Sequence, residues 1–264
     1  MTGVILMYHV VDEPRTPAER QWCCPPKAFE AQMRWLKENC RVVTLDAMVQ
    51  SLRDGLALPP KTVCVTFDDG TRCIVDHALP VLQKCALPAT AFVVAGLLGR
   101  NNDWLVRSGW SRRRLVDESD LRRLSAGGVE IGSHSMTHAD LATLGADGLA
   151  REVRGSKEHL QAVLGAPVRH FAYPFGRLAE PAVAAVREAG YLSACTVEPG
   201  RNDKQVDPLL LRRVEVFGWD SMREFALKTR FAFDHVRPNA HFARGLAKRV
   251  LEWSGLRSPN RYSQ

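Results

Sequence analysis

Two adjacent carboxylates follow an apolar, β-branched run in the chain. Asp68 and Asp69 come directly after Thr62–Phe67, and Gly70 follows them. Ligands gather at the carboxyl ends of parallel strands, so a strand over this run would place both carboxylates at a binding edge. Successive side chains diverge at a strand end, so the two carboxylates are candidates for different tasks. An ordinary Asp-Asp-Gly turn is the competing interpretation.

Two histidines four residues apart follow a second apolar run. His134 and His138 come after Val129–Gly132. This spacing places two imidazoles on one helical face, and a tight loop can also bring them together, which suits one metal ion. Two histidines and one carboxylate leave metal positions open, as in catalytic sites, and the lack of cysteine argues against a closed structural zinc. Coincidence of two unrelated histidines is the alternative.

Two further strand ends carry groups of chemical interest. His9 ends the run Val4–Tyr8 and can serve as acid or base near neutral pH, unless it is a structural histidine bonded to a carbonyl. Phe175 and Gly176 follow a Tyr-Pro dipeptide. Because proline removes one backbone donor and fixes φ, one of their N–H groups is left to face a ligand. A plain strand-ending turn is the alternative there.

The elements that must position these residues alternate along the chain. Short apolar runs are separated by longer stretches of helical periodicity, which predicts an α/β fold with a parallel sheet, either open or closed into a barrel. The strand candidates are Val4–Tyr8, Arg41–Leu45, Thr62–Phe67, Ala89–Val94, Val129–Gly132, His170–Tyr173, Leu192–Val197 and Leu211–Val216. The helix candidates are Lys27–Asn39, Ala47–Arg53 with Asp46 as its N-cap, Ile74–Lys84, Ser119–Ala126, Asp147–Leu164 and Ala182–Ala189.

Three insertions interrupt the alternation. They are Asp12–Pro26, which is rich in proline, Gly99–Val116, which holds Trp104 and Trp110, and the polar turn Gly200–Leu209. Long connections near strand ends often shape binding sites. We therefore expect the tryptophan-bearing insertion to border the site.

Composition and charge restrict the class of protein. With 264 residues, 45% hydrophobic and 25% charged, the chain has a globular composition and is neither disordered nor collagen-like. Its net charge is +7, with the basic excess concentrated after residue 236. We predict a catalytic domain over 1–236 and a basic amphipathic helix and tail over 237–264. The basic tail can contact a membrane or a lipid-linked substrate, or form a solvated helix face.

Several classes of partner and location are disfavoured. The N-terminus has neither a basic leader nor a small-residue cleavage site, which predicts a cytoplasmic protein, with membrane association left open. The longest uncharged stretch, Cys85–Gly99, falls short of the roughly 20 apolar residues of a membrane span. The seven cysteines form no CxxC pair, which predicts reduced thiols without a metal or redox role. Nothing in the sequence indicates nucleic-acid binding.

The motifs together resemble those of the polysaccharide deacetylase (NodB-homology) family, carbohydrate esterase family 4. Thr66–Gly70 is similar to the family's Thr-Phe-Asp-Asp-Gly motif, His134–His138 matches its His-Ser/Thr-x-x-His motif, and Tyr173–Gly176 resembles part of its third motif. The resemblance covers roughly residues 3 to 220 and implies a distorted (β/α) barrel of about seven strands, to which the C-terminal helix is appended. It also implies a divalent metal, usually zinc, in the mouth of the barrel.

The resemblance also implies the roles of individual residues. Asp69, His134 and His138 are similar to the metal ligands, Asp68 to the general base, and the Phe175 backbone N–H to the oxyanion donor.

The general acid is implied by a motif in an unusual place. The family's late Leu-x-His motif is absent after residue 176, and Met7-Tyr8-His9 fits it at the chain start. Some family members have the order of the barrel permuted in this way. The resemblance therefore implies His9 as the general acid and Met7 as a wall of the acetyl pocket.

Two family positions are not matched directly. The arginine that orients the base at the start of the third motif is replaced by Phe171, and we favour Arg213 over Arg169 for that task. The aromatic wall of the acetyl pocket is unassigned, with Trp219 and Trp104 as candidates.

These roles define an expected function and its rivals. We expect a metal-dependent hydrolase that removes N-acetyl groups from N-acetylhexosamine units of a polysaccharide, oligosaccharide or lipid-linked sugar. The alternatives are hydrolysis of another amide, such as a formamide or cyclic ureide, and a non-catalytic carbohydrate-binding protein. The sequence leaves open the sugar, its chain length, the metal used in the cell and the oligomeric state.

Overall fold

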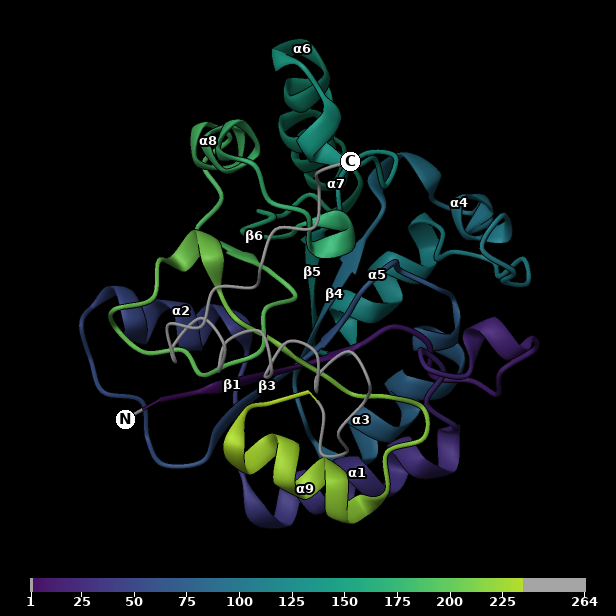
Figure 1. The fold of residues 1–264 in the computed structure, drawn as a ribbon, viewed down its shortest axis with the longest axis vertical. Coiled ribbons are helices and arrows are strands. Elements are labelled where there is room, and N and C mark those ends of the chain that lie inside the picture. Colours follow the sequence, from purple (N-terminus) through teal and green to yellow (C-terminus); the bar gives the residue numbers. More distant parts are fainter. Residues whose placement is uncertain (1, 235–264) are drawn as a thin grey trace, which may run out of the picture.

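Parallel strands form the centre of the protein, which is described here by a computed structural model over residues 2–234. The strands pair in the order β7-β6-β5-β4-β3-β1-β8, and β2 pairs with β3. Their bounds are β1 Val4–Tyr8, β2 Arg41–Val42, β3 Thr62–Phe67, β4 Ala89–Val93, β5 Val129–Ser133, β6 His170–Ala172, β7 Ser193–Cys195 and β8 Val214–Glu215. Every one of these pairings is parallel. The predicted fold is confirmed: the sheet curls into an incomplete barrel surrounded by helices (Figure 1).

Helices cover the outside of the curled sheet (Figure 1). The α-helices are α1 Pro26–Asn39, α2 Leu45–Arg53, α3 Leu79–Cys85, α4 Asp103–Val106, α5 Glu118–Ala126, α6 Ala146–Leu149, α7 Ser156–Leu164, α8 Glu180–Glu188 and α9 Met222–Phe231. Two helices predicted as continuous contain π-helical turns, over Ile74–Ala78 and Ala150–Gly155. Such turns shift the side-chain register inside a helix, which periodicity alone does not reveal.

Apart from the short strand β2, the strands are largely buried on both faces, as parallel strands covered by helices must be. In β1, Val4, Leu6 and Tyr8 pack into the large core beneath the helices. Ile5 points to the opposite face and joins a smaller core with Phe92 inside the curl. The continuous apolar runs seen in the sequence are the consequence of this double burial.

One helix begins differently from the prediction. The N-cap of α2 is Thr44, whose Oγ1 accepts a hydrogen bond from the Ala47 N–H at 3.0 Å, so the assignment of Asp46 as the N-cap was wrong. The early helix start also shortens the predicted strand Arg41–Leu45 to β2. Asp46 lies in the first turn of α2, where a negative charge is still favourable.

The predicted division at residue 236 stays a prediction. The segment 237–264, with its predicted amphipathic helix and membrane contact, lies outside the described residues. Within residues 2–234, no helix has the length and apolar character needed to cross a bilayer.

The cap of α2 is open to a direct test. Thr44→Ala removes the acceptor for the Ala47 N–H and should lower the free energy of unfolding by about 1 kcal/mol, measured by urea denaturation. Thr44→Ser retains a hydroxyl acceptor and should stay close to the unaltered protein. Equal stability of the alanine and serine variants would contradict this assignment.

Candidate active site

The carboxyl ends of the strands open into one cavity of about 500 Å³, which we call the mouth cavity. The chain reaches it from β1, β3, β5 and β6 and from the segments after β7 and around β8. Its lining residues are His9, Gln21, Trp22, Asp68, Asp69, Leu105, Ser108, Trp110, His134, His138, Tyr173, Phe175, Val197, Glu215, Phe217 and Asp234. Six residues that the sequence singled out therefore meet here: His9, Asp68, Asp69, His134, His138 and Phe175.

Asp68 is held by a buried arginine. Arg213 places Nη1 2.6 Å from Oδ1 and Nη2 2.7 Å from Oδ2 of Asp68, and its Nε donates to the Thr196 carbonyl oxygen at 2.8 Å. Arg213 is fully buried and Asp68 nearly so. Burial alone would raise the pKa of Asp68, but the Arg213 charge is the main influence that lowers it. Arg169, the other candidate, instead lies 3.6 Å from Asp46 and is half-exposed.

Asp69, His134 and His138 form a compact group of donors. One ligand atom from each lies within 4.8 Å of the others, and all three side chains are buried. Oδ1 of Asp69 is 3.6 Å from Nε2 of His134 and 3.2 Å from Nε2 of His138. The spacing of the two histidines allowed either a helical face or a tight loop. In the structure they lie on a loop after β5.

The donor set fits a cation. Nδ1 of His134 lies 2.8 Å from the Ala172 carbonyl oxygen, so this nitrogen carries the hydrogen and Nε2 keeps its lone pair. Burial lowers the pKa of His134 to about 4, which keeps the ring neutral. A lone pair on Nε2 then faces the lone pairs of the Asp69 carboxylate, and a positive ion between them removes the conflict.

The loop that carries the histidines is fixed by a residue that sequence reasoning missed. Glu152, in the π turn before α7, accepts hydrogen bonds from the N–H groups of Met136 and Thr137 at 3.0 and 2.9 Å. Its other oxygen accepts from the Thr137 hydroxyl at 2.6 Å. No signal in the local sequence links Glu152 to this loop, because the contact arises only when α7 packs beside β5.

Several site residues have left-handed backbone conformations. The φ angles of Asp69, Ser135, His138 and Phe175 lie between 58° and 67°. Non-glycine residues seldom adopt this region, and such strain clusters at functional sites. Gly176 follows with φ 64°, and a Cβ there would lie 2.1 Å from a Val197 methyl group, so only glycine fits.

His9 has a carboxylate partner that the sequence analysis did not identify. Its Nδ1 lies 3.1 Å from Oε1 of Glu215, which is buried in β8. Burial on its own would lower the pKa of His9, but Glu215 and two further carboxylates nearby raise it to about 9. Glu215 sits inside the strand candidate Leu211–Val216, and no feature of that run linked it to His9. The pairing itself follows from β1 lying beside β8.

The turn after β6 brings Phe175 over the histidines. The Phe175 ring is half-exposed and meets the His138 ring edge-on at 4.5 Å. The Gly176 N–H, the second candidate oxyanion donor, instead donates to the Tyr173 carbonyl oxygen at 3.1 Å.

The aromatic wall differs from the expectation. Trp219 is largely exposed beside Phe217 and does not line the mouth cavity. Trp104 stacks on the His138 ring with centroids 4.7 Å apart, behind the cavity surface. Trp22 and Trp110 line the cavity instead.

Met7 is buried in β1 and is not among the lining residues of the mouth cavity, so its role as a wall of the acetyl pocket stays a prediction. Met7 and His9 point to the same face of the strand, but Met7 lies one pleat deeper, below the level of the cavity.

Comparison with known proteins gives a consistent result. The family model described as polysaccharide deacetylase matches residues 56–194. The chain is 28% identical to the Bacillus subtilis protein YxkH, named as a polysaccharide deacetylase, over 80% of this chain and 70% of the relative. It is 23% identical to the poly-β-1,6-N-acetyl-D-glucosamine N-deacetylase of Staphylococcus aureus, over 69% of this chain and 66% of the relative. The chain thus spans just under two thirds of that staphylococcal relative.

Solved structures share the fold. A polysaccharide deacetylase from Bacillus cereus superposes with a TM-score of 0.74 at 27% identity, covering 87% of this chain and 69% of that chain. IcaB from Ammonifex degensii superposes with a TM-score of 0.72 at 25% identity, covering 87% and 96%. The matched family segment holds the acidic pair and both histidines but neither His9 nor Arg213, so the permuted order stays a prediction.

The Arg213–Asp68 pair should be costly to break. Arg213→Met leaves a buried carboxylate without its partner and should lower the free energy of unfolding by about 3–5 kcal/mol, measured by denaturant titration. Arg169→Met, which removes a half-exposed arginine, should change stability by less than about 0.5 kcal/mol. Similar stability of the two variants would contradict the assigned importance of the pair.

Proposed function

Because this chain belongs to the polysaccharide deacetylase family, we propose that it is a metal-dependent hydrolase that removes N-acetyl groups from N-acetylhexosamine units of a glycan. The substrate is a polysaccharide, an oligosaccharide or a lipid-linked sugar. One observation carries the proposal: the mouth cavity gathers a metal-type donor set, an arginine-paired carboxylate and a carboxylate-paired histidine.

Asp69, His134 and His138 would hold the cation, which we take to be Zn²⁺ since a carboxylate and two imidazoles suit zinc and leave positions open. When bound, the cation supplies Lewis acidity to the acetyl carbonyl and to the attacking water. His134 is ready for this task because its tautomer is set by the Ala172 carbonyl.

Asp68 is the general base in this proposal. The bidentate contact with Arg213 fixes the plane of its carboxylate and keeps it ionised, yet each oxygen retains a free lone pair. Because Asp68 faces the mouth cavity beside Asp69, it can accept a proton from a water molecule there.

His9 is the general acid. Hydrolysis of an amide requires a proton for the departing amine, and a histidine with a raised pKa carries that proton at neutral pH. Glu215 lies beside Nδ1 of the ring as its ion-pair partner, and in this proposal Nε2 is the proton donor. The Phe175 N–H supports the developing oxyanion, since the Gly176 N–H is already bonded.

The substrate class is supported by the staphylococcal relative, whose name assigns it to poly-β-1,6-N-acetyl-D-glucosamine. Two indoles, Trp22 and Trp110, line the cavity, and aromatic rings of this kind can pack against sugar rings. A small amide substrate and a non-catalytic binding protein remain as rival outcomes of the experiment below.

The central experiment measures acetate and free amine released from N-acetylglucosamine oligosaccharides by zinc-loaded protein, with formamides and cyclic ureides in parallel. We expect turnover of the glycans. Asp68→Asn should retain zinc and lose about 10²–10⁴-fold in kcat, whereas His134→Ala should lose both zinc and activity. Elemental analysis after dialysis, at equal folding by circular dichroism, checks the metal content. Full zinc retention by His134→Ala would refute the ligand assignment, and turnover of the small amides alone would refute the substrate class.

Glu215 should set the pH range over which His9 is protonated and can act as the general acid. His9 must be protonated to act, so activity falls as pH rises through its pKa. Glu215→Gln removes the strongest of the three carboxylate charges that raise this pKa, so the pKa of His9 should fall below its value of about 9, as NMR titration of metal-free protein would show. The alkaline limb of the activity profile should move in the same direction. Glu215→Asp retains the charge as a control, and an unchanged limb in Glu215→Gln would contradict this role.

A further inference from the structure

Two segments predicted as insertions meet at one side of the mouth cavity. Gln21 and Trp22 come from the loop after β1, and Leu105, Ser108 and Trp110 come from the loop that contains α4. Figure 1 shows this first loop and α4 on the same side of the molecule. We call these five residues the cavity wall.

The wall also touches the chemical groups of the site. The Trp22 ring meets the His9 ring edge-on with centroids 4.8 Å apart. The Trp104 ring, in the same loop as Trp110, stacks on His138 with an interplanar angle of 17°. The two loops therefore border the proposed acid and a proposed metal ligand, which are themselves positioned by Glu215 and by the loop after β5.

The base of the second loop is closed by Asn102 and Arg113. The Asn102 N–H donates to the Arg113 carbonyl oxygen at 3.1 Å, and the Arg113 N–H donates to Oδ1 of Asn102 at 2.7 Å. Asn102 is fully buried. Residues 102–113 thus form a loop whose ends are pinned together while its middle faces the cavity.

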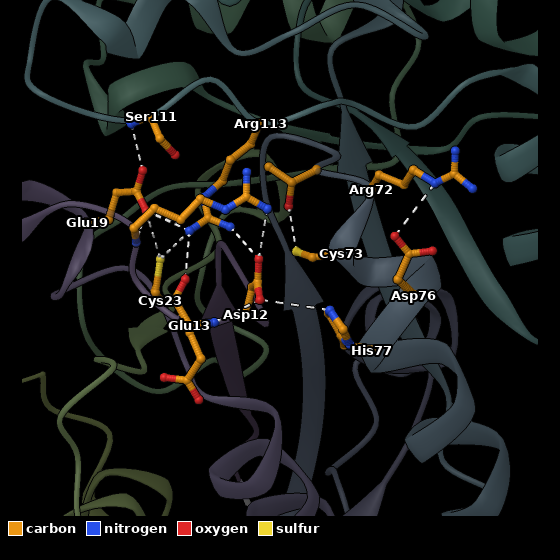
Figure 2. Close-up of polar contacts among 12 residues, drawn as sticks. Asp12, Glu13, Glu19, Cys23, Arg72, Cys73, Asp76, His77, Ser111 and Arg113 are labelled. Carbon is orange, nitrogen blue, oxygen red and sulfur yellow. Dashed lines mark hydrogen bonds and ion pairs between the residues drawn. The ribbon is translucent and has the colours of Figure 1, made fainter.

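Arg113 then joins this loop to the first one. Its Nη1 lies 2.7 Å from Oδ2 of Asp12, and its Nη2 lies 2.6 Å from Oε2 of Glu19 and 2.9 Å from the Glu13 carbonyl oxygen. Figure 2 shows the Arg113 guanidinium between these groups. Glu19, which is fully buried, also accepts from the Ser111 N–H at 2.7 Å, so it bonds the second loop twice. We call these contacts the Arg113 lock.

A buried ion pair of this kind adds little net stability compared with apolar packing, but it fixes the relative position of the groups that it joins. The two loops have little regular structure of their own beyond the short helix α4 and a single 3₁₀ turn at Pro17–Glu19. Arg113 itself does not line the mouth cavity. The lock therefore acts on the site only through the wall that it positions.

We propose that Arg113 is a positioning residue for substrate fit: its lock holds Trp22 and Trp110 where they bind sugar units next to the unit that is deacetylated. This rests on the proposed function for the identity of the substrate. The wall then contributes to affinity for an oligosaccharide, and a small acetyl ester that reaches only the reacting groups does not use it.

The test compares an N-acetylglucosamine pentamer with 4-nitrophenyl acetate as substrates of the zinc-loaded protein. Arg113→Met should raise KM for the pentamer about tenfold and change kcat less than about threefold, while kcat/KM for the ester stays within about twofold. Arg113→Lys, which keeps the charge but not the forked geometry, should give an intermediate KM. Arg114→Met is the matched control, because Arg114 is exposed and, within residues 2–234, pairs with the partly exposed carboxylate of Asp117, so this variant should leave all these values unchanged.

Folding is controlled by a second variant and a second measurement. The double variant Glu19→Gln/Arg113→Met leaves no unpaired charge at Glu19 and should show the same pentamer-specific rise in KM with a normal circular dichroism spectrum. Acrylamide quenching of tryptophan fluorescence in metal-free protein should increase in the Arg113 variants and not in Arg114→Met.

The outcomes separate the two proposals. Equal losses on both substrates, or an unchanged KM for the pentamer, would overturn the positioning role. If the unaltered protein hydrolyses the ester but no glycan, the proposed function fails, and the lock is judged by quenching alone. Unchanged quenching in Arg113→Met would then overturn it.

Discussion

The contact between Arg213 and Asp68 joins the last strand region of the described fold to the end of β3, and much of the site depends on it. A carboxylate this deeply buried would lose its charge without a partner. The full burial of Arg213 is tolerated because the Asp68 carboxylate compensates its charge in turn. The same constraint applies across the mouth cavity. His9 retains a proton because Glu215 lies beside it, and Asp69 stays ionised beside its two histidines. Asp68 and His9 are each held by an opposite charge, so the charge state and the position of these two groups are set together, whereas Asp69 and its two histidines form a donor set that fits a cation.

Around these pairs, neutral groups determine orientation. The Ala172 carbonyl selects the tautomer of His134, and Glu152 binds two of the three residues between the histidines. Left-handed backbone at Asp69 and His138 turns their side chains toward each other at some conformational cost. That cost is met by the buried sheet beneath, whose strands cannot shift without exposing apolar side chains. The rigid strand ends and the adjustable loops therefore have separate tasks: the first hold the reacting groups, and the second surround the space in which a substrate lies.

The elements of the fold were largely predictable because their signals are local. Strands buried on both faces require uninterrupted apolar runs, and the bounds of β1 and β3 agree with those runs residue for residue. Strands defined mainly by pairing were less well predicted: a strand was expected over Leu211–Val216, but only Val214–Glu215 forms the ladder of β8. Helix ends depended on single hydrogen bonds, as the Thr44 cap shows.

The sequence by itself determined which reactive groups stand at strand ends, since motif residues and strand patterns are both read from neighbours along the chain. The acidic pair after β3 and the two histidines after β5 were found in this way. Tertiary structure alone decided which groups became partners: Glu215 for His9 and Arg113 for the two loops of the wall. These contacts join residues far apart in the sequence, and no local pattern records them. They exist because parallel strands deliver their carboxyl ends to one place, where buried charges must find opposite charges.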